Sequence, residues 1–118
     1  MEKNTGLKRL IYASQYSWQG LKSGLINEAA FLQEFVAFIV LTIVTFFLDI
    51  TAVEQIAMII SLTLVLIVEI LNSAIECVVD RVSTERHTLS GRAKDYGSLA
   101  VLMAIIIVVL IWSVILLG

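Results

Sequence analysis

The segment from Gly97 to Gly118 constrains the fold more than any other part of the chain. It contains 22 residues and no charged side chain. As an α-helix it would be about 33 Å long, enough to cross a bilayer whose hydrocarbon core is about 30 Å thick. An uncharged stretch of this length predicts a transmembrane helix, which we place at residues 96–117.

Two further apolar stretches predict two more membrane spans. One is uncharged from Gln55 to Val68 and continues as a helix beyond the membrane. The other ends at Leu48 and is long enough to span only if it begins at Ala29. Both are continuous rather than alternating, and three segments cannot close a β-barrel. We therefore expect a single all-α membrane domain, residues 1–118, with spans at 29–48, 54–80 and 96–117 and a cytoplasmic loop at 81–95.

The composition agrees with a chain that lies mostly in lipid. Hydrophobic residues make up 59% of it and charged residues 15%, against roughly 45–50% and 25% in soluble domains. Too few charged side chains remain to cover the surface of a small soluble domain, and the hydrophobicity excludes disorder. The net charge of −2 gives no indication of a nucleic-acid partner. A single cysteine, Cys77, excludes an intrachain disulfide and a multi-cysteine zinc site.

The basic residues predict the orientation of the spans. Four precede the first span and four lie between the second and third, whereas the loop at residues 49–54 has none. The eight are Lys3, Lys8, Arg9, Lys22, Arg81, Arg86, Arg92 and Lys94. By the positive-inside rule, we expect the N-terminus in the cytoplasm and the C-terminus on the outside.

The segment before the first span has the pattern of an amphipathic helix. Over residues 6–26, its apolar side chains fall within an arc of about 100° on a helical wheel. The arc contains Leu7, Leu10, Ile11, Ser14, Trp18, Leu21 and Leu25. Such a helix suits the membrane surface, with its tryptophan at the interface. The alternative, a helix of a soluble core, would have little other soluble sequence to pack against.

The second span carries the main chemical signal. Glu69, Asn72, Glu76 and Asp80 fall within about 80° of one another on a helical wheel and form one polar stripe. A carboxylate within a span is costly unless it meets a partner, a cation or water, so such acids are usually functional. A structural alternative remains: Asn72 and Ser73 could join helices by hydrogen bonds. Glu76 and Asp80 could simply extend to the membrane surface.

The neighbouring polar residues suggest a magnesium and phosphate site. Mg²⁺ prefers oxygen ligands and is usually held by one or two carboxylates together with substrate phosphates. Glu28, where the surface helix meets the first span, could approach the stripe at the cytoplasmic side. The loop after the second span offers cations, of which Lys94 is the candidate for phosphate, whereas Arg81 and Arg86 fit anchoring at the membrane surface better. His87 fits a surface or nucleotide contact better than a metal ligand.

These features together suggest phosphoryl transfer to a lipid hydroxyl. Acids suited to Mg²⁺ and cations suited to phosphate lie where a span opens to the cytoplasm. The chain has neither the phosphate-binding motif G-x-x-x-x-G-K-[ST] nor the glycine loop and H-R-D motif of protein kinases.

Five segments resemble the bacterial integral-membrane diacylglycerol kinases, the prokaryotic diacylglycerol kinase family. They begin at Tyr16 (YSWQGL), Ile26 (INEAAF), Val68 (VEILNSAIE), Val79 (VDR) and Leu89 (LSGRAKD). The resemblance covers nearly the whole chain. It implies a homotrimer in the bacterial inner membrane, with a surface helix and three spans per subunit and active sites at subunit interfaces near the cytoplasm. The implied reaction converts MgATP and diacylglycerol to ADP and phosphatidic acid by direct in-line transfer.

The resemblance also implies roles for individual residues. Glu69 corresponds to the base that takes the proton from the lipid hydroxyl. The other implied catalytic residues are Asn72, Lys94 and Asp95, and the implied metal ligands are Glu28 and Glu76. The implied nucleotide contacts are Arg9, Glu28, Glu76, Glu85, Arg86, His87, Lys94 and Asp95. The implied lipid contacts are Ser14, Ser17, Trp18, Glu34 and Ser98.

Two positions depart from the family pattern. Arg86 stands where close relatives commonly have an aromatic residue, and Ser14 stands where they often have alanine. Two alternatives stay open. The undecaprenol kinases, a related family, share the acids. In a different class, a small membrane transporter or accessory subunit could also bury an essential glutamate, although small exporters usually have four spans.

Overall fold

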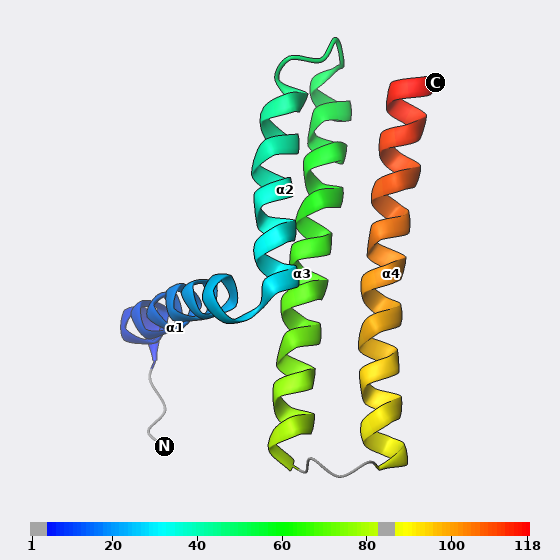
Figure 1. Cartoon of the computed structure of the whole chain (residues 1–118). Helices are drawn as coiled ribbons and strands as arrows, with labels where there is room; N and C mark the ends of the chain where they lie inside the picture. The colour runs from blue at the N-terminus through cyan, green and yellow to red at the C-terminus, as the bar shows by residue number, and fades with distance from the viewer. Residues whose placement is uncertain (1–4, 83–86) are drawn as a thin grey trace.

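The chain folds into four helices in the computed structural model, which describes residues 5–82 and 87–118. In chain order they are α1 (Gly6–Asn27), α2 (Ala29–Thr45), α3 (Ala52–Val82) and α4 (Thr88–Leu117). α2, α3 and α4 stand side by side, and α1 extends sideways from the base of α2 (Figure 1). The described residues contain no strand, so the predicted all-α fold is confirmed.

Two of the helices are long and apolar enough to cross a membrane. They are α3 and α4, whose most apolar stretches have mean hydropathies of 2.2 and 3.2. α2 has 17 residues, about 26 Å of helix, and passes the same test only together with α1. These two helices are bent by 106° at their junction. The structure therefore supports a membrane protein with two spans, or three if the bent pair is one span.

The bend between α1 and α2 lies at Glu28, whose backbone is extended (φ −114°, ψ 100°). One turn earlier, Gly24 is buried, and a Cβ there would lie 3.0 Å from side-chain atoms of both Ile70 and Phe31. The missing side chain thus lets the end of α1 pack closely against α2 and α3. As a result, α1 joins the bundle partway along α3, and α3 continues past it (Figure 1).

A capping box starts α3 at the opposite end of the bundle. The backbone N–H of Glu54 donates to Thr51 Oγ1 at 3.1 Å, and the Glu54 side chain accepts from the backbone N–H of Thr51 at 2.9 Å. This exchange satisfies N–H groups that a helix start leaves free. Gln55 Nε2 also donates to Thr45 Oγ1 at 3.1 Å and ties α3 to the end of α2.

One face of α3 forms the centre of the bundle. Its buried residues follow helical spacing and are Met58, Ser61, Leu62, Val65, Glu69 and Ser73. The buried residues of α4 are Gly97 and Ala104, and small side chains allow two helices to approach closely within a membrane. Away from the polar stripe, Trp112 Nε1 donates to Ser61 Oγ at 3.2 Å.

The connection between α3 and α4 is shorter than the predicted loop at 81–95. α3 continues through Val82 and α4 begins at Thr88, so residues 88–95 are helical. His87 precedes the first turn, and its Nδ1 accepts from the backbone N–H of Leu89 at 3.1 Å. The prediction was wrong because it took polarity as a sign of a loop. Polar residues outside a membrane do not oppose a helix, and this segment contains no proline.

The other boundaries lie close to the predicted ones. α1 matches the predicted 6–26 to within one residue. α2 ends at Thr45 rather than at 48, because residues 46–48 form a turn. α3 begins two residues before the predicted 54.

Candidate active site

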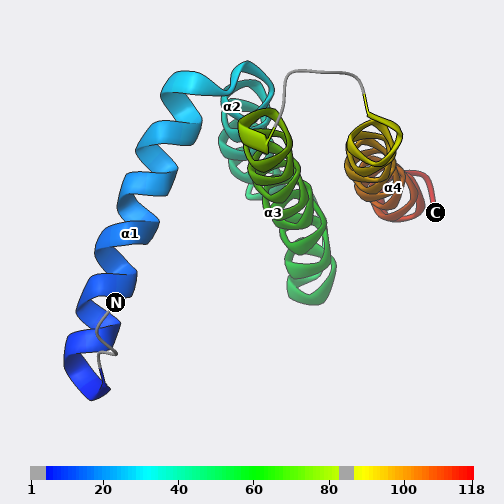
Figure 2. The same ribbon diagram turned by 90° about the horizontal axis from the view of Figure 1, so that it is seen from below.

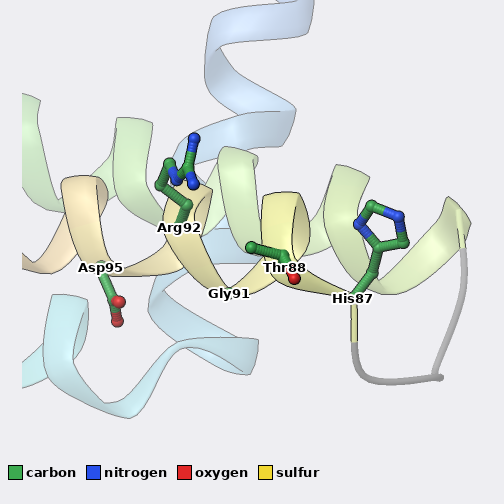
Figure 3. Close-up of a pocket in the computed structure, with 5 residues that line it drawn as sticks. All are labelled: His87, Thr88, Gly91, Arg92 and Asp95. Atoms are coloured by element: carbon green, nitrogen blue, oxygen red, sulfur yellow. The ribbon is translucent and has the colours of Figure 1, made fainter.

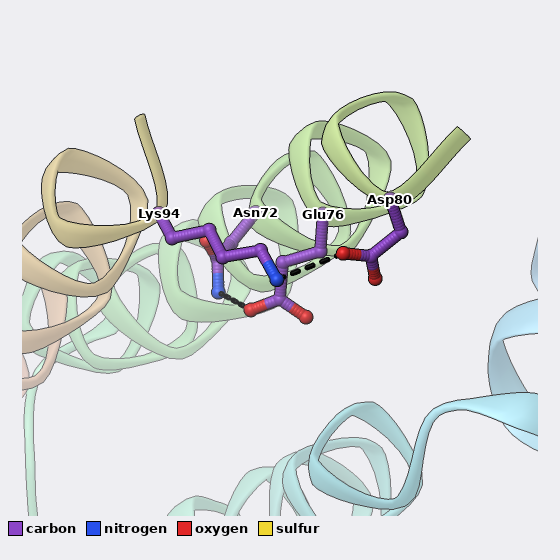
Figure 4. Close-up of polar contacts among 4 residues, drawn as sticks. All are labelled: Asn72, Glu76, Asp80 and Lys94. Atoms are coloured by element: carbon purple, nitrogen blue, oxygen red, sulfur yellow. Dashed lines mark hydrogen bonds and ion pairs between the residues drawn. The ribbon is translucent and has the colours of Figure 1, made fainter. Parts of the chain in front are cut away.

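The polar stripe lies along the part of α3 nearest the α3–α4 connection. Glu69 is buried, with 7% of its surface exposed, Asn72 and Glu76 are half-buried, and Asp80 is exposed. Asn72 Nδ2 donates to Glu76 Oε1 at 3.3 Å, which fixes the amide beside the carboxylate (Figure 4). The stripe therefore runs from the interior of the bundle to its surface.

Asn72 is held against α4 at a glycine. A Cβ at Gly97 would overlap Asn72 Oδ1, so only glycine lets the two helices approach this closely here. In the described part of the chain, Asn72 Oδ1 is buried without a hydrogen-bond partner. A buried acceptor of this kind is unfavourable unless a donor or a cation reaches it. Asn72 thus has its nitrogen on Glu76 and an oxygen without a partner at the interface with α4.

Lys94 bridges the two helices at the open end of the stripe. Its Nζ lies 2.8 Å from Asp80 Oδ1, and both side chains are substantially exposed. The hydrogen bond to Asp80 and the charge of Asp80 raise the pKa of Lys94 above its usual range. Figure 4 shows the amine bonded to the carboxylate of Asp80, which lies one turn beyond Glu76 on α3. A cation thus stands where the acids reach the surface.

Two acids outside α3 lie near Glu69. They are Glu28, at the bend, and Glu34, on α2, and the charge of each interacts with that of Glu69. Glu76, on α3 itself, interacts with Glu69 in the same way. In the described residues, one carboxylate oxygen of Glu34 is buried without a partner. Several acids thus gather around Glu69 from three places in the chain.

Glu34 also borders a small cavity between the helices. The cavity has a volume of about 140 Å³ and is otherwise apolar. It is lined by Glu34, Ala37, Phe38, Leu62, Val65, Ile105 and Val108, which come from α2, α3 and α4. Glu34 is thus the one predicted lipid contact that lines this largely apolar cavity.

A larger, open pocket of about 580 Å³ lies along the first turns of α4. It is lined by His87, Thr88, Gly91, Arg92 and Asp95 (Figure 3). His87 and Asp95 were predicted nucleotide contacts. Thr88, Gly91 and Arg92 were not, although their spacing of three or four residues puts them on one helix face with Asp95. That signal was missed because the segment was expected to be a loop.

The predicted residues of α1 are not brought to the stripe in one chain. Ser14 and Ser17 donate to backbone carbonyls of their own helix, and Lys22 Nζ lies 5.8 Å from the centre of the Trp18 ring. Arg9, Ser14, Ser17 and Trp18 are exposed on a helix that leads away from the bundle (Figure 2). Ser98 is exposed on α4. Glu85 and Arg86 lie outside the described residues.

The donor set around Glu69 fits a hard divalent cation in part. Glu28, Glu76 and the free oxygen of Asn72 are the oxygen ligands that Mg²⁺ prefers. Within residues 5–82 and 87–118, however, no three acidic, histidine or cysteine side chains stand close enough to hold a metal. A cation here would need further oxygens, and Mg²⁺ commonly takes these from water and substrate phosphates.

Fold and site together define an integral membrane protein. Its helix α3 carries acids from the interior to the surface, where a lysine of α4 meets them. Comparison with known proteins specifies the class further. The model of the prokaryotic diacylglycerol kinase family matches residues 15–116. The chain belongs to this family.

Curated relatives cover almost the full length of the chain. The diacylglycerol kinase of Escherichia coli K12 is 54% identical over 112 residues, which are 95% of this chain and 92% of the relative. The diacylglycerol kinase of Haemophilus influenzae is 53% identical over 96% of both chains. That of Pseudomonas aeruginosa is 49% identical over 97% of this chain and 93% of the relative.

Proposed function

We propose that the chain transfers the γ-phosphoryl group of MgATP directly to the free hydroxyl of diacylglycerol at the polar stripe of α3. The kinase activity follows from family membership and from near-full-length similarity to diacylglycerol kinases. The observation that supports this location is the run of Glu69, Asn72 and Glu76 from the buried interior to a surface where Lys94 stands.

Glu69 is the proposed base. As the bond forms between the lipid oxygen and phosphorus, the carboxylate of Glu69 takes the proton from the hydroxyl. The bond between phosphorus and the bridging oxygen breaks, and the electron pair leaves with ADP. The packing that buries Glu69 keeps out water that would otherwise compete as the nucleophile. No covalent enzyme intermediate is needed when both substrates are held in line.

Glu28 and Glu76 are the proposed ligands of Mg²⁺, with Asn72 holding Glu76 in place. Their support is the charge interaction of both acids with Glu69 and the hydrogen bond from Asn72 to Glu76. The bound ion would neutralise negative charge on the phosphates. The hydrogen bond from Asn72 holds Glu76 between the buried Glu69 and the exposed Asp80 along α3.

The proposed nucleotide contacts lie at the open end of the stripe and on the first turns of α4. Lys94 would meet the phosphates, and His87 and Asp95 would contact the rest of the nucleotide in the open pocket. Arg92 would add a cation to the same pocket. Arg9, Glu85 and Arg86 complete the set that the resemblance implies.

We place the chain in the bacterial inner membrane with three spans, a cytoplasmic N-terminus and a periplasmic C-terminus. α1 would lie on the cytoplasmic surface, because Leu7, Leu10 and Trp18 are 74%, 65% and 59% exposed. A helix of a soluble core would bury such side chains. Ser14, Ser17, Trp18, Glu34 and Ser98 would then contact lipid.

We further propose a homotrimer with shared active sites. Within the most apolar stretch of α4, only 6% of the residues are buried in one chain, which leaves apolar surface for lipid or other subunits. α1 leads away from its own stripe, so its residues can reach the stripe of a neighbour. A trimer would therefore bring the separated parts of the site together.

The proposed substrate is tested by comparing lipids. Purified protein receives MgATP with diacylglycerol, with undecaprenol or with no lipid alcohol, and ADP and phospholipid are measured. We expect ADP formation to require diacylglycerol and to match phosphatidic acid formation one to one. Faster phosphorylation of undecaprenol would overturn the substrate, and ADP formation without any lipid alcohol would overturn the kinase mechanism.

A further inference from the structure

The ion pair between Lys94 and Asp80 joins the last turns of α3 to the second turn of α4. The two residues are 14 positions apart, and Lys94 Nζ and Asp80 Oδ1 are separated by 2.8 Å. It is the only ion pair between side chains in the described parts of the chain. The relative exposures of the side chains are 45% for Lys94 and 61% for Asp80. Water screens a pair this exposed, so it contributes little to folding stability.

The pair lies where it affects the site. Glu76 is one turn before Asp80 on the same face of α3, and its charge also acts on Lys94. Figure 4 shows the lysine reaching across from α4 to α3, where its amine is bonded to Asp80. A flexible lysine could pair with either acid. Its pairing with Asp80 leaves Glu76 free.

We propose that Asp80 is a positioning residue for Lys94: it holds the amine at the surface end of the stripe, where nucleotide phosphates enter, and keeps it off Glu76. The proposal rests on the proposed function, which assigns Lys94 to the phosphates and Glu76 to the metal. Arriving phosphate then replaces Asp80 as the partner of an amine that is already in place. Asp80 itself needs no contact with either substrate.

A variant without the Asp80 charge has a specific expected effect. In Asp80→Asn, the lysine loses its hydrogen-bond partner and is no longer held away from Glu76, where its charge can compete with the cation. A larger apparent KM for MgATP with nearly unchanged kcat indicates lost binding rather than lost chemistry. Asp80→Glu retains the charge one methylene further out and is expected to restore part of the affinity.

The test combines kinetics with a measurement that does not depend on activity. In nucleotide-free protein, the rate at which an amine-reactive acetylating ester modifies Lys94 is measured by peptide mass spectrometry. Because Asp80 raises the pKa of Lys94, Asp80→Asn lowers it and increases the fraction of free amine at a given pH. We expect Lys94 in Asp80→Asn to be modified faster than in the wild type, since a lower pKa leaves more free amine at the same pH.

The kinetic arm uses Asp80→Asn, Asp80→Glu, Lys94→Ala and the Asp80→Asn/Lys94→Ala double variant, with Asp49→Asn as the control. Asp49 is an exposed aspartate near the opposite end of the bundle. We expect KM for MgATP to rise at least about threefold in Asp80→Asn with kcat within about twofold. The double variant should match Lys94→Ala, because residues that act as one unit are not additive.

Each contrary result has one meaning. If Asp80→Asn has the wild-type modification rate and KM while Lys94→Ala is impaired, the positioning role is wrong and the proposed function stands. The same holds if Asp80→Glu fails to restore any affinity. Full activity of Lys94→Ala would remove Lys94 from the proposed site and overturn both proposals. Folding of every variant is checked by thermal unfolding in detergent micelles.

Discussion

At the scale of single residues, Asn72 combines three properties of the site. It donates to Glu76 at 3.3 Å, its own oxygen is buried without a partner in the described residues, and it faces Gly97 across the interface with α4. A free buried acceptor is unfavourable in the isolated chain and useful once a cation or donor arrives. The residue therefore supports the assignment of its hydrogen-bond partner, Glu76, to the metal.

Glu76→Gln is expected to weaken the use of magnesium. The amide keeps the size of the side chain but removes the charge that attracts the cation. The Mg²⁺ concentration needed for half-maximal activity should rise at least about tenfold, as is typical when the surroundings of a metal site are damaged. The control is Cys77→Ala at the next position, which is exposed and should change activity less than about twofold. An unchanged magnesium requirement in Glu76→Gln would contradict the metal assignment.

At the scale of elements, α3 divides into two functional halves. Its first half begins with the capping box at Thr51 and is joined to α4 by the hydrogen bond with Trp112. Its second half carries the acids to the surface beside α4. Substitutions in the two halves should therefore separate stability from activity.

Gly97→Ala tests the close approach of α3 and α4. The added methyl group would overlap Asn72 Oδ1, so either the helices separate or Asn72 moves away from Glu76. Overpacking of this kind costs about 1–3 kcal/mol of stability, and we expect activity to fall with it. Unfolding in mixed micelles and kinase assays measure the two effects. Gly91→Ala on the same helix, where a Cβ meets nothing within 4 Å, should not lose stability. Equal unfolding free energies of Gly97→Ala and Gly91→Ala would contradict the close packing at Gly97.

Trp112→Phe tests the other half. It removes the donor to Ser61 Oγ and to the backbone oxygen of Met58, at 3.2 and 3.4 Å. We expect a loss of about 0.5–1.5 kcal/mol of unfolding free energy with kcat unchanged below the unfolding temperature. A fall in kcat of more than about tenfold in folded protein would show that the two halves of α3 are not independent.

At the scale of the whole molecule, the sequence predicted the helices better than it predicted their contacts. Hydropathy and spacing located α1 and α3 to within two residues and identified the Glu69–Asp80 face, because both depend on local periodicity. The start of α4 at Thr88 was missed, since polarity was taken for a loop, and the pocket residues Thr88, Gly91 and Arg92 were missed with it. The contact between Gly97 and Asn72 and the pairing of Lys94 with Asp80 depend on how α3 and α4 pack, which no local pattern reveals.

Mixing of inactive subunits tests the shared site. Glu69 lies in the stripe of α3, and Lys94 of the same chain meets the open end of that stripe, whereas Arg9 lies on α1, which leads away from it. Mixing Glu69→Gln with Arg9→Ala should restore activity up to about a quarter of the wild-type level, because random trimers contain that share of intact sites. Mixing Glu69→Gln with Lys94→Ala should restore none. Equal results for both mixtures would contradict this arrangement, and size measurements in detergent would test the trimer itself.

The most direct test of the polar stripe as the catalytic centre is the rate of phosphatidic acid formation by Glu69→Gln. We expect a loss of at least about 100-fold in kcat, the usual contribution of a general base, with the protein still folded and assembled. Glu54→Gln, the matched change elsewhere on α3, should keep its rate because glutamine also serves in a capping box. A Glu69→Gln protein with more than half the wild-type rate would show that Glu69 is not the base.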